Sequence, residues 1–547
     1  MTRTMPTSGG QQFSFKLQFI FFSIFVLLNA ALFLNAVPVL HDTHDLDLTH
    51  PVYAGAADGQ RYWGVAKNLT ERGTFHYALG PDKLVRLKRG GPIPPIVFAG
   101  LMSLSSFENA PLLIIGFQAL LLFATSLLSR TLAAPFSISK NLVQGLVLFN
   151  PSLIGLVHHA QSEIVFLFFF TSILFFSIKL LTGNQSDRYS FIGIGICTGL
   201  LLLTRPAGLF FVISLPLLLS LAVYFSQKEF SQALKTVRRQ IVPACLVATL
   251  MAAPWGLYNY LKFGDTGFIS GAGSVLSFNH YLLANASASR TGTKSDQRTA
   301  EDLIDQAVAR GISACCTLFL LAEVSSSRFG IRSHQRVPEY LIDSAVAQGI
   351  SSDCALSGDL IPNFSEGTKR KYSCGSIDLS EDYQDVLASL HIGAIKSYGL
   401  ADWSHALLRA WISTFIGGGI SPIAQYMQIR TPDTRTLNKE YRGPLSFGVY
   451  FLETITASPG YALLFMTGVS FALICRFLGI VGFLSHSTNR TLLPYNILYV
   501  GCIAIFTATY LFIGVSRFRA HLEPILAIYG VLGITILLQR SKRSQKR

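Results

Sequence analysis

The sequence predicts an all-α polytopic membrane protein with about ten to twelve transmembrane helices and a small, mostly helical extracytoplasmic insertion. Composition is the first reason. Half of the 547 residues are hydrophobic and 14% are charged, and the mean hydropathy is +0.44, unlike a soluble globular domain. The second reason is that the apolar residues form runs long enough to cross about 30 Å of hydrocarbon at about 1.5 Å per residue.

The first apolar run, residues 13–38, carries Lys16 as its one charge. No small-residue cleavage site follows it, so we expect an uncleaved membrane anchor. Each later run is expected to form one helix, because backbone amides in lipid must be paired within their own segment. These runs are 111–132, 142–157, 164–181, 191–204, 206–225, 241–260, 461–484, 492–513 and 521–538, with weaker ones at 406–420 and 447–457.

Lys and Arg in the short connections orient the helices, because positively charged loops stay in the cytoplasm. They are Arg3, Lys16, Arg130, Lys140, those between Lys228 and Arg239, and those from Arg540 onward. Both termini are then cytoplasmic, and three regions lie outside: residues 39–110, the turn 158–163 and residues 262–400. These loops and a basic outer patch account for the +14 formal charge, so no nucleic-acid partner is expected.

The chain therefore divides into three units. We expect an N-terminal transmembrane catalytic module over 1–261, with its first outer loop at 39–110. An outer insertion follows over 262–400, and a C-terminal transmembrane module covers 401–547.

The insertion contains an internal repeat, because residues 298–316 recur as 336–354 with the same spacing of Arg, Glu, Leu-Ile-Asp, Gly and Cys. The apolar spacing fits two amphipathic helices that end at Gly. The insertion also holds Cys315, Cys316, Cys354 and Cys374. An oxidising compartment would allow up to two disulfides of undetermined pairing, and reduced buried thiols are the alternative. We expect a lid or an acceptor-recognition element.

The first outer loop carries the candidate base. Asp58 is the candidate general base, that is, a carboxylate that takes a proton from a reacting group. Capping of a helix that begins near Gln60 is the alternative role. Asp45 and Asp47 are the other candidates. A dense basic patch follows in the same loop, at the depth where a lipid phosphate would lie: Lys83, Arg86, Lys88 and Arg89. It predicts either phosphate binding or anchoring to anionic headgroups.

Further ionisable residues stand at the outer ends of later runs. Glu163 heads an otherwise apolar run, and an ionisable group there indicates function by default, as a second acid or a metal contact. We expect Tyr62, His158 and His159 to line the substrate cavity. Arginines near outer ends of spans could complete the phosphate site or could snorkel to the interface; they are Arg205, Arg517 and Arg519.

A possible metal site lies just after the first run. The side chains concerned are His41, Asp42, His44, Asp45, Asp47 and His50. Imidazole and carboxylate groups suit several divalent metals, but these residues lack a fixed ligand spacing. A divalent ion is therefore a possible cofactor, no other cofactor is expected, and a polar juxtamembrane loop is the alternative.

Motifs spread over the chain outside the insertion carry a family resemblance. They are Asp58, Tyr62, Ala66, Leu69, Gly73, Phe75, Pro92 and Pro95, Asn150-Pro151 with Ser162-Glu163, Thr204 to Gly208, Ala253-Pro254-Trp255 with Tyr258-Asn259 and Gly264, and Ser516 to Arg519 with Pro524. In this order they resemble the GT-C glycosyltransferase superfamily, specifically the protein-mannosyltransferase-like branch that includes bacterial lipid A aminoarabinose transferases. Members of that branch often have a second acid beside the first-loop aspartate, whereas Gly59 follows Asp58 here.

The resemblance implies a GT-C-like fold and a polyprenyl-phosphate-linked sugar donor. It also implies inverting transfer to a lipid, glycan or protein acceptor at the extracytoplasmic face of a bacterial inner membrane, among membrane lipids. Such transfer needs a carboxylate for the acceptor's proton, cations for the departing phosphate and a cavity reachable from the bilayer. The alternatives are a polysaccharide ligase or polymerase, or a transporter of lipid-linked or small solutes. P-loop, HExxH and GxSxG motifs are absent from the sequence.

Overall fold

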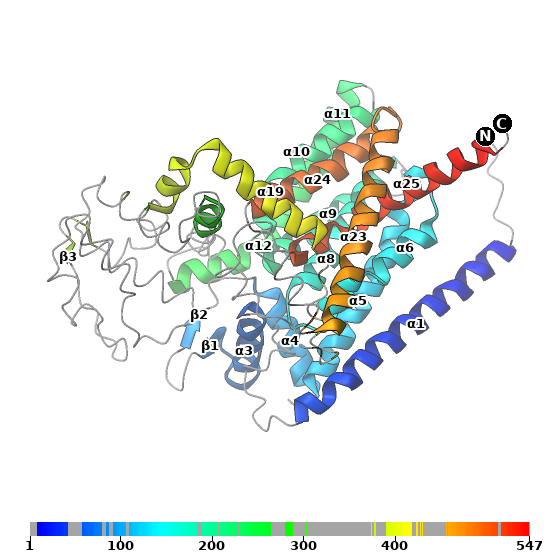
Figure 1. Ribbon diagram of the computed structural model, residues 1–547. Coiled ribbons are helices and arrows are strands. Elements are labelled where there is room, and N and C mark those ends of the chain that lie inside the picture. Colours follow the sequence, from blue (N-terminus) through cyan, green and yellow to red (C-terminus); the bar gives the residue numbers. More distant parts are fainter. Residues whose placement is uncertain are drawn as a thin grey trace.

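The protein folds as a bundle of long helices (Figure 1). The computed structural model describes residues 8–41, 57–78, 84–86, 91–105, 109–182, 189–205, 207–227, 229–263, 279–287, 302, 306, 373–374, 377–378, 390–417, 419, 423–424, 427, 429, 456, 458–511, 513 and 516–545. The start of α1 (Ser8–His41) and the end of α25 (Glu523–Ser544) lie at one end of the bundle, and α3 (Ala57–Arg72) lies at the other.

The helices of the first half follow one another with short connections. After α1 and α3 come α4 (Ile93–Ser103), α5 (Ala110–Leu132), the 3₁₀ turn η1 (Ala134–Phe136), α6 (Lys140–Leu148), α7 (Pro151–Val157), α8 (Glu163–Thr182), α9 (Ser190–Thr204), α10 (Gly208–Gln227), α11 (Phe230–Thr236), the π-helical turn η3 (Val237–Ile241) and α12 (Val242–Phe263).

The second half adds four long helices, α19 (Leu400–Ile416), α23 (Pro459–His486), α24 (Leu493–Tyr510) and α25, with the 3₁₀ segment η5 (Ser516–Leu522) before the last. The described strands form two short antiparallel pairs. One pair is β1 (His76–Ala78) with β2 (Leu84–Arg86), and the other is β3 (Ser373–Cys374) with β4 (Ile377–Asp378).

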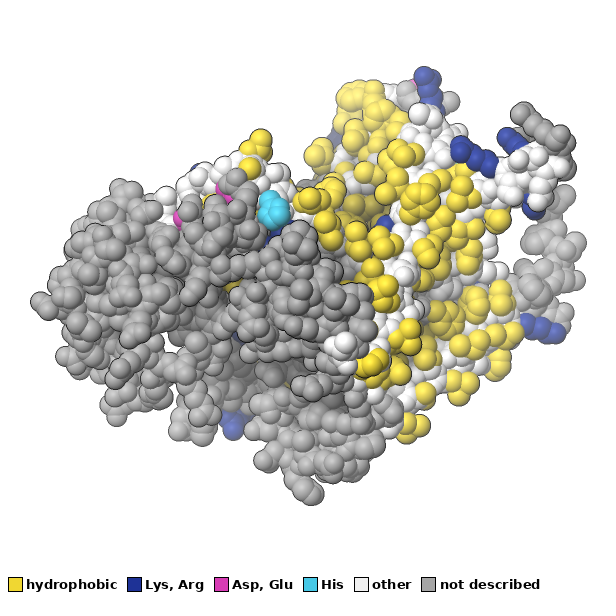
Figure 2. Space-filling model, viewed as in Figure 1, with side chains coloured by type: hydrophobic (Ala, Val, Ile, Leu, Met, Phe, Trp, Pro, Cys, Tyr) yellow, Lys and Arg dark blue, Asp and Glu magenta, His cyan; other side chains and the backbone are white. Residues whose placement is uncertain are grey.

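Eight helical segments of the described residues are long and apolar enough to cross a membrane. They coincide with eight of the predicted runs, so the chain is an all-α polytopic membrane protein, as predicted. Hydrophobic side chains cover much of the visible bundle surface, whereas Lys and Arg gather toward its ends (Figure 2). The run 191–204 forms α9, which has 15 residues, and the weak run 406–420 ends early in α19. The weak run 447–457 lies outside the described residues except for Thr456.

The predicted span 142–157 is corrected, because the structure divides it into α6 and α7. Asn150 adopts an extended conformation there, and its side-chain oxygen accepts hydrogen bonds from the backbone N–H groups of Ser152 and Leu153. Pro151 then begins α7 at a position where no N–H is needed. This Asn-Pro pair ends one helix and starts the next, which hydropathy alone does not reveal.

Aromatic packing joins the two transmembrane halves. Phe170 of α8, Phe211 of α10 and Phe506 of α24 are all fully buried and lie with ring centroids 5.0 to 5.7 Å apart. Such rings bury large apolar areas and prefer these edge-on and offset geometries. The halves therefore share one core, which brings sites at 163, 205 and 517 within reach of one another.

The described part of the insertion packs against α19. Helical segments 279–287 and 390–397 meet through His280 and His391, whose Nδ1 atoms are 3.0 Å apart. Asp302 is hydrogen-bonded to His280 and to the Tyr398 hydroxyl. Of the predicted repeat, only residues 302 and 306 are described, and of its four cysteines only Cys374, in β3. The predicted repeat helices and disulfides thus lie outside the described residues.

Helices α23 and α25 approach closely because glycines face each other. A Cβ at Gly482 would lie 2.3 Å from the carbonyl oxygen of Tyr529, and a Cβ at Gly533 would lie 2.0 Å from that of Leu478. Small residues at such contacts let membrane helices pack backbone to backbone.

We expect Gly533→Ala to destabilise the protein by about 1–3 kcal/mol, because the methyl group would force the two helices apart. The matched control is Gly116→Ala in α5, where an added Cβ meets no atom within 4 Å. It should be neutral or slightly stabilising, since Ala favours helix more than Gly. Thermal unfolding of the detergent-solubilised variants measures both, and equal melting temperatures would contradict the close packing.

Candidate functional site

Three charged side chains from distant parts of the sequence meet inside the bundle. Glu163 Oε1 lies 2.6 Å from Arg205 Nη1 and 3.8 Å from Arg517 Nε. The Glu163 side chain is 3% exposed, against 11% for Arg205 and 26% for Arg517. We call these three residues the Glu163 cluster. It carries a net positive charge, and Arg517 is its most accessible member.

Local structure explains why each charge stands where it does. Glu163 is the first residue of α8, where a carboxylate interacts favourably with the helix dipole. Arg205 caps the end of α9 in an extended conformation, where a cation is favoured for the same reason. Arg517 belongs to η5, which packs against α8. The cluster therefore links both transmembrane halves.

An aromatic pair forms one side of the Glu163 cluster. The ring of Phe518 lies 5.5 Å from the guanidinium carbon of Arg205 and 5.1 Å from that of Arg517. The ring of Tyr510 also stacks on the Phe518 ring, with the two ring centroids 4.1 Å apart and an interplanar angle of 7°. Cation–π contacts of this kind hold guanidinium groups in place without neutralising them.

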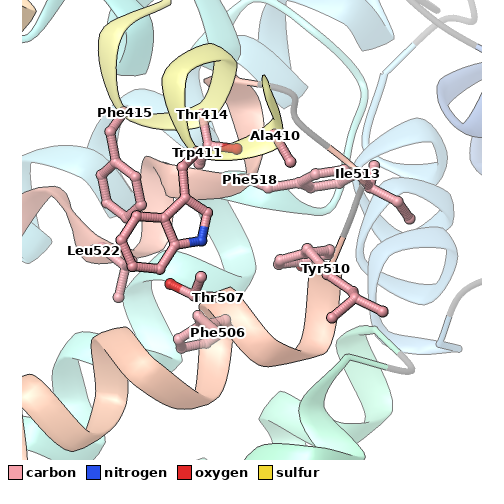
Figure 3. A pocket seen from close by; sticks show the side chains of 11 residues that line it. Ala410, Trp411, Thr414, Phe415, Phe506, Thr507, Tyr510, Ile513, Phe518 and Leu522 are labelled. Carbon is pink, nitrogen blue, oxygen red and sulfur yellow. The ribbon is translucent and has the colours of Figure 1, made fainter. Parts of the chain in front are cut away.

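The same aromatic pair lines an apolar groove (Figure 3). Trp411 projects from α19 toward Thr507 and Phe506 of α24, and Phe415 of α19 points toward Leu522, around a space with an empty volume of about 310 Å³. Trp411 is 53% exposed, so the groove opens toward the surroundings of the bundle. The complete lining consists of Ala410, Trp411, Thr414, Phe415, Phe506, Thr507, Tyr510, Leu511, Ile513, Phe518 and Leu522. An apolar groove and a cationic cluster thus share one wall.

The first outer loop reaches the cluster through α3. The hydroxyl of the buried Tyr62 lies 3.4 Å from the Ser162 hydroxyl, next to Glu163. Asp58 lies one helical turn before Tyr62, on the same side of α3, because residues four apart share a helix face. The helix begins at Ala57, so Asp58 lies within its first turn and does not precede it as an N-cap. Its side chain is outside the described residues.

The basic part of the first loop is tied to the same region by Gly91. Its backbone N–H donates to the carbonyl oxygen of Thr204, next to Arg205, at 3.2 Å. A Cβ at Gly91 would lie 1.7 Å from the carbonyl oxygen of Leu203, so only glycine allows this approach. Arg86 lies in β2, paired with His76, and its side chain is outside the description. Lys83, Lys88 and Arg89 lie outside the described residues.

The predicted cavity histidines are buried in the turn before α8. His158 Nε2 lies 2.9 Å from the side-chain oxygen of Asn29 in α1, and its side chain is 1% exposed. Burial, together with the neighbouring His159, lowers the pKa of His158 to about 3. Burial lowers the pKa of His159 to about 4, with Glu163 opposing and Arg517 assisting the shift. Both imidazoles are therefore neutral at neutral pH.

Arg519 is engaged within the fold. Its Nε donates to Glu523 Oε1 at 2.7 Å, and its Nη1 donates to the carbonyl oxygens of Thr414 and Gly417 at the end of α19. Arg476 of α23 also donates to Glu523 Oε1, at 2.7 Å. The Arg519 side chain is 2% exposed. These contacts favour a structural role for Arg519, although the sequence predicts phosphate binding.

Three residues in or near the site were not predicted from the sequence. Tyr510 looked like an ordinary residue of an apolar run, and its stacking on Phe518 depends on the tertiary fold. His521 is fully buried, with its ring 4.4 Å from that of Phe166. Glu523 was passed over as well, although a carboxylate entering an apolar run signals a buried partner.

No metal centre is apparent in the part of the chain that the structure describes, where no group of three or more His, Cys, Asp or Glu side chains is arranged to hold a metal ion. The predicted cluster from His41 to His50 lies outside that part, apart from the backbone of His41 at the end of α1. A divalent ion there remains a prediction.

No protein-family model matches the chain, and no curated protein matches it. Solved structures do match. The *Archaeoglobus fulgidus* oligosaccharyltransferase AglB, in complex with an inhibitory peptide and a dolichol-phosphate, is 15% identical over 97% of this chain and 51% of its own, with a TM-score of 0.46. The apo form of the *A. fulgidus* oligosaccharyltransferase is 15% identical over 97% of this chain and 52% of its own, with a TM-score of 0.47.

A second protein also matches. ArnT from *Cupriavidus metallidurans* bound to undecaprenyl phosphate is 13% identical over 94% of this chain and 77% of its own, with a TM-score of 0.33. The present chain spans about half the length of the archaeal structures.

The buried histidines predict how stability depends on pH. Their folded-state pKa values lie below the ordinary value of 6.5, so the unfolded chain binds protons first as the pH falls. The free energy of unfolding should therefore be highest above about pH 6.5 and should fall below that pH. At about pH 5 the loss should be roughly 2 kcal/mol per histidine. Melting temperatures measured between pH 7 and 5 test this.

The double variant His158→Gln, His159→Gln should show a shallower decline than the parent. Gln161→Asn, a change of a non-titrating residue in the same turn, is the control and should keep the parental slope. Parallel pH profiles for the parent and the double variant would show that these two imidazoles do not set the dependence.

Proposed function

We propose that the protein is an inverting glycosyltransferase that moves a sugar from a polyprenyl-phosphate-linked donor to an acceptor. The observation that carries the proposal is the wall shared by the Glu163 cluster and the apolar groove. A lipid-linked phosphate needs cations beside an apolar surface, and Phe518 touches both arginines of the cluster while lining the groove.

The donor phosphate would bind Arg517 and Arg205, with the prenyl chain along the groove between α19 and α24. Guanidinium groups suit this role because they bind phosphate oxygens in pairs and stay charged when partly buried. Arg517 is the more exposed of the two and lies at the longer distance from Glu163. Its exposure makes it the more accessible of the two arginines to a phosphate. The basic first loop, from Lys83 to Arg89, would cover the phosphate from the outer side.

Transfer requires one base and one stabilised leaving group. The acceptor oxygen attacks the anomeric carbon from the side opposite the phosphate. The bond from that carbon to the phosphate oxygen breaks, and its electron pair leaves with the polyprenyl phosphate, whose charge the arginines stabilise. Asp58 would take the acceptor's proton as the new bond forms. Its place one turn from Tyr62, which contacts Ser162, supports this assignment.

Glu163 fits a positioning role better than that of the base. A carboxylate held by two guanidinium groups is a weak proton acceptor, because its charge is already stabilised. Its ion pair instead holds Arg205 and turns it toward the shared wall. Of the two predicted catalytic acids, Asp58 is therefore the proposed base, whereas Glu163 is proposed to position Arg205.

The site would lie at the extracytoplasmic face of a bacterial inner membrane. Positive loops favour a cytoplasmic position for both termini. The turn before Glu163 contacts α3 through Ser162 and Tyr62, and α3 lies at the end of the bundle away from the start of α1 (Figure 1). The acceptor is a lipid, glycan or protein, selected by the insertion 262–400. That insertion divides the catalytic transmembrane module 1–261 from the module 401–547.

We expect Asp58→Asn to reduce transfer by about 10²-fold or more, because an amide keeps the shape of the carboxylate but cannot accept the proton. The measurement is mass spectrometry of surface glycans and lipids from a deletion strain that carries each variant. Glu71→Gln, an exposed acid on the same helix, is the matched control and should restore the parental profile. A deletion strain with unchanged glycans and lipids would instead favour a transporter.

We expect Arg517→Gln and Arg205→Gln each to weaken binding of undecaprenyl phosphate by about 10- to 100-fold, since a charge-assisted contact contributes roughly 1.5–3 kcal/mol. Native mass spectrometry of the purified protein with added lipid measures this. Arg490→Gln, an exposed arginine in the connection between α23 and α24, is the control. Parental affinity in both cluster variants would remove these arginines from the donor site.

A further inference from the structure

A second hollow lies between the ends of α23 and α25, on a part of the protein that the proposed transfer reaction does not use. Its empty volume is about 480 Å³. It is lined by Ser485 and His486 of α23 and by Ile536, Gln539, Arg540 and Arg543 of α25. In Figure 1 the end of α25 lies at the end of the bundle away from α3.

The glycine contact between the two helices explains where the hollow begins. At Gly482 and Gly533 the backbones touch, because no side chain separates them. Four residues after Gly482 and six after Gly533, the residues that line the hollow are large and polar, as His486 and Gln539 show. Backbones in contact, followed by long side chains, leave a wedge-shaped space that opens toward the helix ends.

The hollow is cationic and has no acid nearby in the sequence. Arg540 and Arg543 are three residues apart and so share one side of α25. Between residues 459 and 547 the only acid is Glu523, at the opposite end of α25, where it binds Arg519 and Arg476. The Nδ1 atom of His486 is buried and makes no hydrogen bond within the structure. Two guanidinium groups beside an imidazole nitrogen favour an anionic oxygen ligand.

An apolar surface borders the hollow on α25, where Ile536 lines it and the next residue, Leu537, is 41% exposed. Exposed apolar side chains on membrane-spanning helices contact acyl chains, whereas a free phosphate ion would gain nothing from them. A ligand that fits both features has an anionic head at the arginines and hydrocarbon along Ile536 and Leu537.

We propose that this hollow binds the headgroup of an anionic phospholipid, with phosphate oxygens on Arg540 and Arg543 and acyl chains over Ile536 and Leu537. This end of the bundle carries the positive connections that face the cytoplasm. Anionic lipids enrich the cytoplasmic leaflet and attract juxtamembrane arginines. Because the lipid would hold α23 and α25 together beyond their glycine contact, its binding should raise the stability of the helix pair.

The test uses the purified full chain in zwitterionic detergent, with phosphatidylglycerol, phosphatidylcholine or soluble glycerol phosphate added. Native mass spectrometry counts bound lipid, and thermal unfolding reports stabilisation. We expect phosphatidylglycerol to bind and to raise the melting temperature. The double variant Arg540→Gln, Arg543→Gln should bind it at least about tenfold more weakly. Ser485→Asp, which places a negative charge in the hollow, should have the same effect.

The matched control is Lys542→Gln, which removes one charge from the same turn of α25 at a position that does not line the hollow. It should keep parental binding. If Lys542→Gln lost as much phosphatidylglycerol binding as the double variant, net charge alone would explain the effect and the proposal would be overturned. Equal stabilisation by glycerol phosphate, equal binding of phosphatidylcholine, or unchanged binding in the double variant would overturn it as well.

Discussion

The ion pair between Glu163 and Arg205 is the interaction on which the arrangement of the candidate site depends. Its two atoms lie 2.6 Å apart in a region where the carboxylate is 3% exposed. Isolated charges are costly to bury, so each requires the other, and removing one partner of such a pair is strongly destabilising. The pair therefore fixes the start of α8 against the end of α9, and Arg517 joins it from η5.

A second buried ionic group fixes the far side of the groove. Glu523 accepts hydrogen bonds from Arg519 and Arg476, and Arg519 also binds the last carbonyl groups of α19. One carboxylate thereby holds α19, α23 and α25 around η5. Because η5 also carries Arg517 and Phe518, this ionic group also positions those two residues. Arg517 and Arg519, two residues apart, thus make different contacts, which the short motif at 516–519 does not reveal.

Sequence patterns predict the helices well and the site only in part. Apolar runs suffice for the eight long spans, because length and hydropathy are local properties. The break at Asn150-Pro151 was missed because its flanks are equally apolar, and only the capping of α7 by Asn150 reveals it. The pairing of Glu163 with Arg205 and Arg517 joins residues separated by tens to hundreds of positions, so no local pattern encodes it. Glu163 was nevertheless recognisable, since an acid at the head of an apolar run needs a buried partner.

The position of the Glu163 cluster explains why the proposed reaction would suit this fold. The cluster keeps cationic groups beside an apolar groove, and Phe518 separates the two environments while touching both. With two guanidinium groups and one carboxylate, the Glu163 cluster carries a net positive charge that a donor phosphate could neutralise in the proposed reaction. Arg519, whose Nε and Nη1 groups donate to Glu523 and to backbone carbonyls, is 2% exposed, whereas Arg517 is 26% exposed, so Arg517 is the more accessible of the two to a phosphate.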